Sequence, residues 1–289
     1  MIKFILSILI FTVSTFSVHA ETSVWKVNKG DNIIYFGGTV HLLRDSDFPL
    51  PGEFELAYLN SDRLVFETDI AALTTPEGQQ KLIKSMTAKP SERIDQRLSA
   101  ETMKRLSAEI TKRGMDINAL KHFKASMIMI ILQMNDLNQL GVSSEGVDSY
   151  YNKRAVKDKK SVVGFETIDE QFSFLSAMGE GDEEQFVRSS LDDLDKQLLM
   201  YEKLISAWRD GDNKKLDELI VSEMKLNYPE VFEQLIVQRN NNWFPKIKAL
   251  FNEPGTEYIL VGAGHLVGED GILARLEKEG YKVTQIALK

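Results

Sequence analysis

The chain has 289 residues, a formal net charge of −8 and no cysteine, so it cannot form disulfide bonds, use a thiolate nucleophile or bind a metal through sulfur. The negative charge, with no basic run interleaved with aromatic residues, argues against nucleic-acid binding. With 43% hydrophobic and 27% charged residues, the composition is typical of a globular protein with a substantial core.

Residues 1–20 predict a cleaved secretory signal peptide. A positive charge at Lys3 precedes an apolar run over residues 4–13, and Val18-His19-Ala20 ends on a small residue. The run is too short to span a bilayer. We therefore expect cleavage after Ala20, a periplasmic or secreted protein, and no membrane span after cleavage. An uncleaved amphipathic anchor is the alternative.

The chain then continues with two predicted strands, residues 24–27 and 33–37. Both are rich in β-branched and aromatic residues, and the turn Asn28-Lys29-Gly30-Asp31 between them favours a hairpin. The second strand leads directly into Gly38-Thr39-Val40-His41. Its glycine allows the backbone to approach closely whatever the histidine faces.

A short helix is predicted over residues 51–60, because a proline begins the segment and apolar residues recur along it. Residues 63–67 then form a short apolar strand that ends on Glu67. A strand–helix–strand unit is right-handed and makes its two strands parallel. Glu67 should therefore lie at the same edge of the sheet as His41.

From residue 74 to about 252 the pattern is mostly helical. Residues 99–113 and 116–140 predict two helices, and the second is apolar on every side, which favours burial within a bundle. Residues 187–208 repeat apolar side chains at spacings of four and three, as in a helix packed along another helix.

A third short strand, residues 160–166, interrupts these helices and ends on Glu166. Later in the chain, the strand 257–261, the loop Gly262-Ala263-Gly264-His265, and the residues beyond it predict a second strand–helix–strand unit. The predicted fold class is therefore α/β: a central, mainly parallel sheet built from both ends of the chain, with a large helical insertion.

We expect the chain after the signal peptide to form one domain, because strands from both ends share the sheet. The helical insertion should form a cap over the strand ends. The predicted domain is residues 21–289, with a sheet core from 21–70, 160–167 and 255–289 and a helical cap from 74–155 and 168–252.

Four predicted strand ends carry residues that bind metals or move protons. In a parallel sheet these ends meet at the carboxyl edge, where open α/β folds build their sites. Two imidazoles and a carboxylate suit Zn²⁺, Mn²⁺ or Fe²⁺ and leave positions for water and substrate. A second carboxylate would then accept a proton from the bound water. The four residues are His41, Glu67, Glu166 and His265.

Each of these residues also has a plainer interpretation. Either histidine alone is compatible with a hydrogen-bonded loop residue. Glu67 and Glu166 each precede a threonine and a predicted helix start, so both are compatible with helix capping.

Arg239 and Asp148 are two further candidates. Arg239 lies within an apolar stripe over residues 228–250, and a buried guanidinium is costly unless it is paired, so it should meet a carboxylate or a substrate anion. A snorkelling side chain or a structural ion pair is the alternative. Asp148 begins a predicted helix that carries Tyr150 and Tyr151, either as its cap or as a partner for Arg239.

Six blocks in order along the chain resemble the TraB/GumN family, and the resemblance extends from Trp25 to Val283. The order of the blocks makes the resemblance specific, although no single block does. The blocks are Gly38-Thr39-Val40-His41-Leu42-Leu43, Leu64-Val65-Phe66-Glu67, Gly146-Val147-Asp148, Val163-Gly164-Phe165-Glu166-Thr167, Arg239-Asn240-Asn241-Asn242-Trp243 and Val261-Gly262-Ala263-Gly264-His265-Leu266.

That family is similar to the Tiki membrane metalloproteases and, more distantly, to erythromycin esterases and haem-binding ChaN-like proteins. The resemblance to Tiki implies a divalent-metal site made by two Gly-x-x-His motifs and a glutamate, which fall on His41, His265 and Glu67. The chain departs from the family in the doubled glycine Gly37-Gly38, where a bulky residue usually precedes the Gly-Thr pair. This departure should alter the turn and not the ligands.

The sequence therefore predicts an exported hydrolase that depends on a divalent metal, Mn²⁺, Zn²⁺, Co²⁺ or Fe²⁺, and acts on a peptide or a small molecule. His41 and His265 would hold the metal, and Glu67 would be a further ligand or the general base. Arg239 would orient a substrate carboxylate or stabilise an oxyanion. The supporting residues would be Asp148 and Glu166.

Two alternatives stay open. The erythromycin esterases imply a metal-independent hydrolase in which a histidine is the general base. The ChaN-like relatives imply a non-catalytic protein that binds haem or a peptide, and Tyr150 and Tyr151 are its candidate haem ligands.

Overall fold

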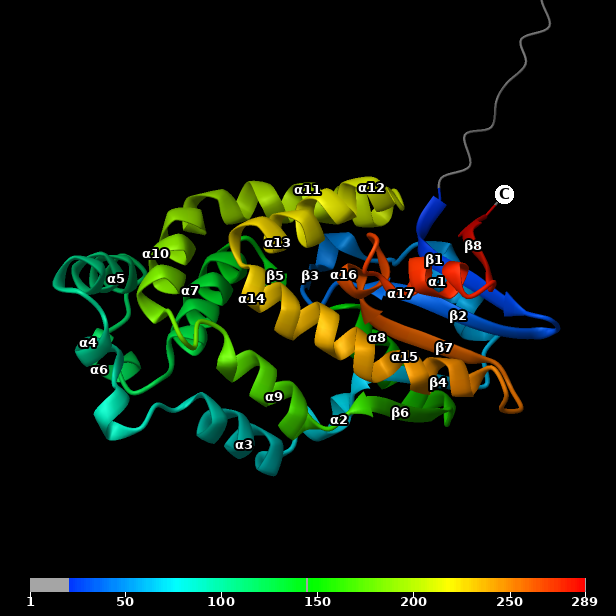
Figure 1. Ribbon diagram of the computed structural model, residues 1–289, viewed down its shortest axis with the longest axis horizontal. Helices are drawn as coiled ribbons and strands as arrows, with labels where there is room; N and C mark the ends of the chain where they lie inside the picture. The colour runs from blue at the N-terminus through cyan, green and yellow to red at the C-terminus, as the bar shows by residue number, and fades with distance from the viewer. Residues whose placement is uncertain (1–20, 144, 289) are drawn as a thin grey trace, which may run out of the picture.

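The computed structural model describes residues 21–143 and 145–288 (Figure 1), so the predicted signal peptide over residues 1–20 and its cleavage after Ala20 lie outside the described residues. A six-stranded sheet lies at one end of the molecule. Its strands are, in spatial order, β6 (Ser161–Glu166), β4 (Arg63–Thr68), β7 (Glu257–Gly262), β2 (Asn32–Thr39), β1 (Glu21–Lys29) and β8 (Lys282–Ala287).

The sheet is mainly parallel, as the sequence predicts. Strands β6, β4, β7 and β2 are parallel to their neighbours, and β1 pairs antiparallel with both β2 and β8. The central strands β4 and β7 are buried nearly throughout, which explains why they read as continuous apolar runs instead of alternating ones. Because β7 lies between β2 and β4, the carboxyl ends of all three meet at one edge.

Helices that adjoin the sheet connect its strands. The helix in the crossover from β2 to β4 begins directly after Pro51, as the sequence predicts. Two short helices lie between β7 and β8, and the longer one begins at residue 272. These helices are α1 (Gly52–Leu59), α2 (Ile70–Leu73), α8 (Val147–Asp158), α15 (Gln238–Leu250), α16 (Ala263–Leu266) and α17 (Ile272–Lys278).

The helical insertion extends from the carboxyl edge of the sheet along the long axis of the molecule (Figure 1). It has a hydrophobic cluster of its own, separate from the cluster around the sheet. The single-domain organisation stays a prediction. The insertion helices are α3 (Pro76–Met86), α4 (Ile94–Arg97), α5 (Ala100–Lys112), α6 (Ile117–Leu120), α7 (Ala125–Gln139), α9 (Ile168–Ala177), α10 (Glu183–Asp193), α11 (Gln197–Arg209), α12 (Asn213–Leu216), α13 (Glu223–Asn227) and α14 (Pro229–Phe232).

The continuous helix predicted over residues 116–140 is wrong, since it divides into α6 and α7. The backbone between them pairs with the segment after α3: the Ala88 amide donates to the His122 carbonyl, and the Lys124 amide donates to the Met86 carbonyl, each at 2.8 Å. Similarly, the helix predicted over residues 187–208 is interrupted by a 3₁₀ turn at Leu194–Lys196. In the described part of the chain, no helix is long and apolar enough to cross a membrane.

A two-stranded sheet that the sequence does not predict ties the insertion to the edge of the main sheet. It pairs β3 (Leu43–Arg44) with β5 (Val142–Ser143). Just beyond it, the Val147 amide donates to the Val40 carbonyl at 3.0 Å. Gly146 lies so close to the loop that an added β-carbon would be 2.3 Å from the His41 carbonyl. The start of α8 is therefore held against His41.

We expect Gly146→Ala to destabilise the protein by roughly 1–3 kcal/mol, because the added methyl group would have to displace the backbone at His41. Urea unfolding of the variant beside the wild type measures this loss. The control is Lys157→Ala, at an exposed position of α8, which should change stability by less than about 0.5 kcal/mol. Equal stability of Gly146→Ala and the wild type would contradict the close approach.

Candidate functional site

Three side chains from distant parts of the chain surround Gly262 at the carboxyl edge of the sheet. A β-carbon added to Gly262 would lie 3.2 Å from Glu67 Oε1, 3.6 Å from His265 Cδ2 and 3.7 Å from His41 Nε2. Only a residue without a side chain leaves this space open. The structure thus brings together His41, Glu67 and His265, the residues predicted to form a metal site. We call the space that they border beside Gly262 the cradle.

Glu67 ends β4 and is 4% exposed. Its Oε1 accepts a hydrogen bond from the Gly262 amide at 2.7 Å, and its Oε2 accepts one from Arg239 at 2.5 Å. Burial would raise the pKa of Glu67, but the charges of Arg239 and of protonated His41, with the Gly262 amide, hold that pKa well below its usual range. Glu67 is therefore an ionised carboxylate and, in this arrangement, a weak general base.

Arg239 is the hub of the ion-pair network. Its guanidinium contacts Glu67, and it donates two hydrogen bonds to Glu166, from Nη2 at 2.6 Å and from Nε at 3.2 Å. The side chain is 8% exposed, so the pairing predicted for a buried arginine is present. Burial raises the pKa of Glu166, although Arg239 opposes this. The Trp243 indole donates a further hydrogen bond to Glu166 at 3.1 Å.

His265 is buried on α16, and two residues of α15 hold its ring. Its Nε2 lies 3.2 Å from an Arg239 Nη, and its Nδ1 lies 2.8 Å from Asn240 Oδ1. Because a guanidinium only donates, Nε2 accepts and the ring proton lies on Nδ1. Burial lowers the pKa of His265 to about 3, so the ring is neutral and Nε2 carries a lone pair.

His41 is the exposed member of the cluster, with 60% of its side chain accessible. Its Nδ1 lies 2.7 Å from Asp148 Oδ2, which leaves Nε2 facing the cradle at Gly262. The Asp148 carboxylate raises the pKa of His41 to about 9. Asp148 was also predicted as a partner for Arg239, and that interpretation is wrong: the approach of Gly146 to the His41 carbonyl places Asp148 on the histidine.

Sequence reasoning assigned no role to Asn240 or Trp243, although both lie in the block that begins with Arg239. Asn240 is fully buried, and its side-chain amide also donates to the His265 carbonyl at 3.2 Å. The ring centres of Trp243 and His265 are 4.5 Å apart. A polar residue beside Arg239 within an apolar stripe was the available signal for Asn240.

The donor set fits a divalent metal in its chemistry. Both histidines have Nδ1 held by another side chain and Nε2 on the side of the cradle, as metal-binding histidines do. The spacing is wider than a closed site requires: Glu67 Oε1 and His265 Nε2 are 3.8 Å apart, and no three His, Asp or Glu side chains of the described residues can hold a common ion as they stand. Arg239 would have to leave His265 Nε2 for a metal to take its lone pair.

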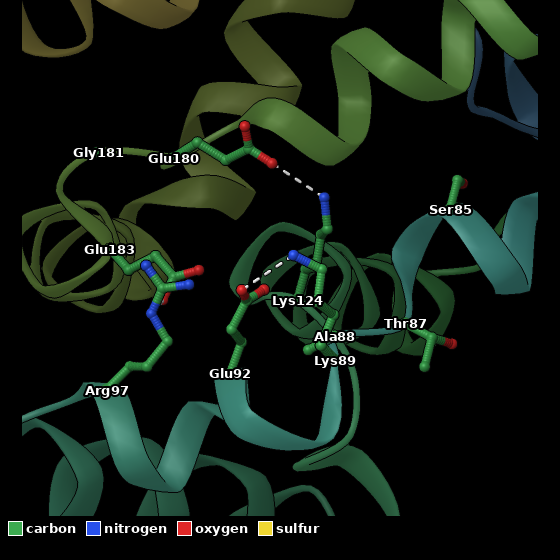
Figure 2. A pocket seen from close by; sticks show the side chains of 10 residues that line it. All are labelled: Ser85, Thr87, Ala88, Lys89, Glu92, Arg97, Lys124, Glu180, Gly181 and Glu183. Atoms are coloured by element: carbon green, nitrogen blue, oxygen red, sulfur yellow. Dashed lines mark hydrogen bonds and ion pairs between the residues drawn. The ribbon is translucent and has the colours of Figure 1, made fainter.

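A polar cavity of about 470 Å³ lies elsewhere, within the helical insertion, and shares no lining residue with this cluster (Figure 2). Its charges are already paired with one another, at 2.8–3.1 Å. Such a balanced wall leaves little charge to recognise a ligand. The pairs are Lys89 with Glu92, Arg97 with Glu183, and Lys124 with Glu180.

Comparison with known proteins gives a family and several distant relatives. The model of the TraB/PrgY/gumN family matches residues 23–285. The "Uncharacterized protein YbaP" of Escherichia coli (strain K12) is 23% identical over 84% of this chain and 87% of its own length. No solved structure matches.

Two relatives are named as metalloproteases. "Metalloprotease TIKI1" of Homo sapiens is 24% identical over 90% of this chain, and the "Metalloprotease TIKI homolog" of Nematostella vectensis is 24% identical over 87% of it. The matches cover 61% and 64% of the lengths of those two proteins. This distant similarity points to a hydrolase of the peptidase class.

Replacing Arg239 by glutamine should destabilise the protein by roughly 3–5 kcal/mol, because the buried carboxylates of Glu67 and Glu166 would lose the guanidinium that pairs with both. Urea unfolding at pH 7 measures the loss. Lys248→Gln is the matched control on the same helix: its pair with Glu279 is partly exposed and should contribute less than about 1 kcal/mol. Equal effects of the two substitutions would contradict the structural role of Arg239.

The low pKa of His265 should make folding sensitive to acid. Between pH 6.5 and about 3 the unfolded chain binds a proton at this histidine and the folded chain does not, so stability should fall as the pH falls, by roughly 1.4 kcal/mol per pH unit. His41, with its raised pKa, is protonated in both states below pH 6 and adds no slope there.

The measurement is the free energy of unfolding of the wild type and of His265→Gln at pH 7, 6 and 5, in the presence of a chelator. The free energy of unfolding of the variant should fall less steeply as the pH falls. The difference in slope should be about 1.4 kcal/mol per pH unit, which corresponds to one bound proton. Parallel curves would show that His265 does not titrate as described.

Proposed function

This chain belongs to the TraB/PrgY/gumN family, whose model matches residues 23–285, and from this premise we propose that it is a metal-dependent hydrolase that cleaves peptide bonds. The observation that carries the proposal is the meeting of His41, Glu67 and His265 around Gly262. The names of the TIKI relatives support the reaction class. We further propose that the protein is exported, to the periplasm or the medium, after removal of residues 1–20.

In this proposal His41, His265 and Glu67 hold the ion, which is Mn²⁺, Zn²⁺, Co²⁺ or Fe²⁺. When bound, the ion polarises the scissile carbonyl and lowers the pKa of a water molecule. The low pKa of Glu67 favours its role as a ligand over that of a general base. Asp148 and Asn240 hold the Nδ1 atoms of the two histidines and so fix both rings.

Arg239 has a separate role in the proposal. Its guanidinium is held by Glu166 and lies against Glu67 and His265. Once it has left His265 Nε2 for the metal, it would still offer a substrate oxygen near Gly262 a positive charge anchored by Glu166. A preorganised donor of this kind stabilises the negative charge that develops on an oxyanion. Glu166 therefore acts through Arg239 and has no contact with the substrate.

A metal-independent hydrolase is the second candidate, and one observation favours it. Arg239 already lies against both Glu67 and His265, where its charge takes the place that a metal ion would fill. Haem binding has less support. Tyr151 is 1% exposed and is packed among Phe54, Tyr58 and Tyr258, so it offers no ligand to haem.

The test combines metal analysis of the purified protein with peptide hydrolysis, for the wild type, His41→Ala and His265→Ala. The wild type should contain metal in stoichiometric amount and lose its activity in a chelator, and both variants should lose metal and at least a hundredfold in kcat/KM. His122→Ala is the control, because His122 is exposed and lies outside the cluster.

Unchanged metal content in both variants would remove the metal from the proposal. Activity that persists in a chelator but disappears in His41→Ala would favour the metal-independent hydrolase. A protein that binds peptides and never cleaves them would contradict both candidates.

A further inference from the structure

A second cavity, of about 540 Å³, opens beside His41 and extends into the helical insertion. Its walls come from the loop after β2, from α7, α10 and α11, and from the helical turns that precede α15. The lining is mainly apolar, with side chains such as Val40, Leu42, Ile130, Leu204 and Leu235. His41 lines this cavity and also borders Gly262, so the cavity adjoins the cluster at that histidine.

Four of the ten methionines of the chain line this cavity: Met129, Met178, Met200 and Met224. Methionine has an unbranched, polarisable side chain that adapts to apolar partners of different shape. A methionine-rich wall therefore favours apolar ligands in general and does not select one particular side-chain shape.

Several polar groups in the wall are hydrogen-bonded to other side chains of the protein. Tyr201 Oη donates to Asp47 at 3.2 Å, and Tyr228 Oη donates to Asp193 at 2.9 Å, as does Lys196 at 2.8 Å. In the helices that form the wall, the backbone N–H and C=O groups are hydrogen-bonded to one another within each helix, so they are not free to bind a ligand. A peptide backbone buried here would leave its amides unsatisfied, whereas an apolar side chain would lose nothing.

We propose that this cavity takes the large apolar side chains of a peptide substrate whose backbone crosses the cradle at Gly262. The inference rests on the proposed hydrolase function and names its substrate class: peptides with bulky apolar residues beside the bond that is cleaved. Leucine, methionine and phenylalanine are accepted alike, because the methionine-rich wall adapts to each. Serine and other small polar side chains gain nothing from it.

The test is the binding of fluorescein-labelled eight-residue Gly/Ser peptides, each with a central triplet of Leu, Met, Phe or Ser, to the full chain. We expect the three apolar peptides to bind roughly ten- to hundredfold more tightly than the serine peptide, the gain expected from burying one large apolar side chain. Their own dissociation constants should differ by less than about fivefold.

Substitution at Leu204, a half-buried residue of the wall on α11, tests the location. Leu204→Asp should weaken binding of the Leu peptide at least tenfold and leave the Ser peptide unchanged. The matched control is Leu199→Asp on the same helix, where the leucine is 59% exposed and does not line the cavity. If Leu204→Asp does not fold, the wild-type peptide series still decides the question.

Equal binding of the Leu and Ser peptides overturns the inference. Tighter binding of a decanoyl ester than of any peptide also overturns it, because the occupant would then be an acyl chain. Turnover of all peptides at one rate contradicts the cavity's role and leaves the proposed hydrolase intact. Selective binding of apolar peptides without any hydrolysis supports the cavity and contradicts the proposed function.

Discussion

The candidate site depends on one buried cation between two carboxylates. Arg239 joins Glu67 at the end of β4 to Glu166 at the end of β6, and it comes from the first turn of α15. A guanidinium removed from water is tolerated only if its charge and its donors are matched. The position of α15 is therefore fixed to within hydrogen-bond distance of two strands, and with it the two residues that hold His265.

This arrangement gives the two histidines different properties. His265 is enclosed by protein, faces a permanent positive charge and is neutral, whereas His41 is exposed, faces a carboxylate and favours protonation. Glu67 lies between them as a permanent anion. The environment, more than the residue type, thus sets what each group offers to a ligand: a lone pair at His265, a negative charge at Glu67, and at His41 a nitrogen that must first release a proton to bind a metal.

The strands and their common edge could be predicted because each rests on local information. Apolar runs identify β2, β4 and β7, and the handedness of the crossover makes β2 and β4 parallel, so His41 and Glu67 share an edge. The partner of Asp148 could not be predicted in the same way. It depends on the two-residue strands β3 and β5 and on the approach of Gly146, which leave almost no periodic signal. Asn240 was hidden for a related reason: its role is set entirely by a residue from another element.

The order of strands has a consequence for how the protein is made. In the sheet, β7 lies between β2 and β4, but in the chain it comes after both of them and after the helical insertion. A nascent polypeptide that ends before residue 257 contains His41 and Glu67 but lacks β7. Without β7, which pairs with both β2 and β4, the two residues cannot meet at a common edge of the sheet. The sheet is therefore completed only when β7, which is synthesised after the insertion, pairs with both β2 and β4. Such non-local pairing is a slow step in folding. The cluster of His41, Glu67 and His265 around Gly262 therefore stays unassembled during synthesis, so an unfinished chain lacks the candidate site.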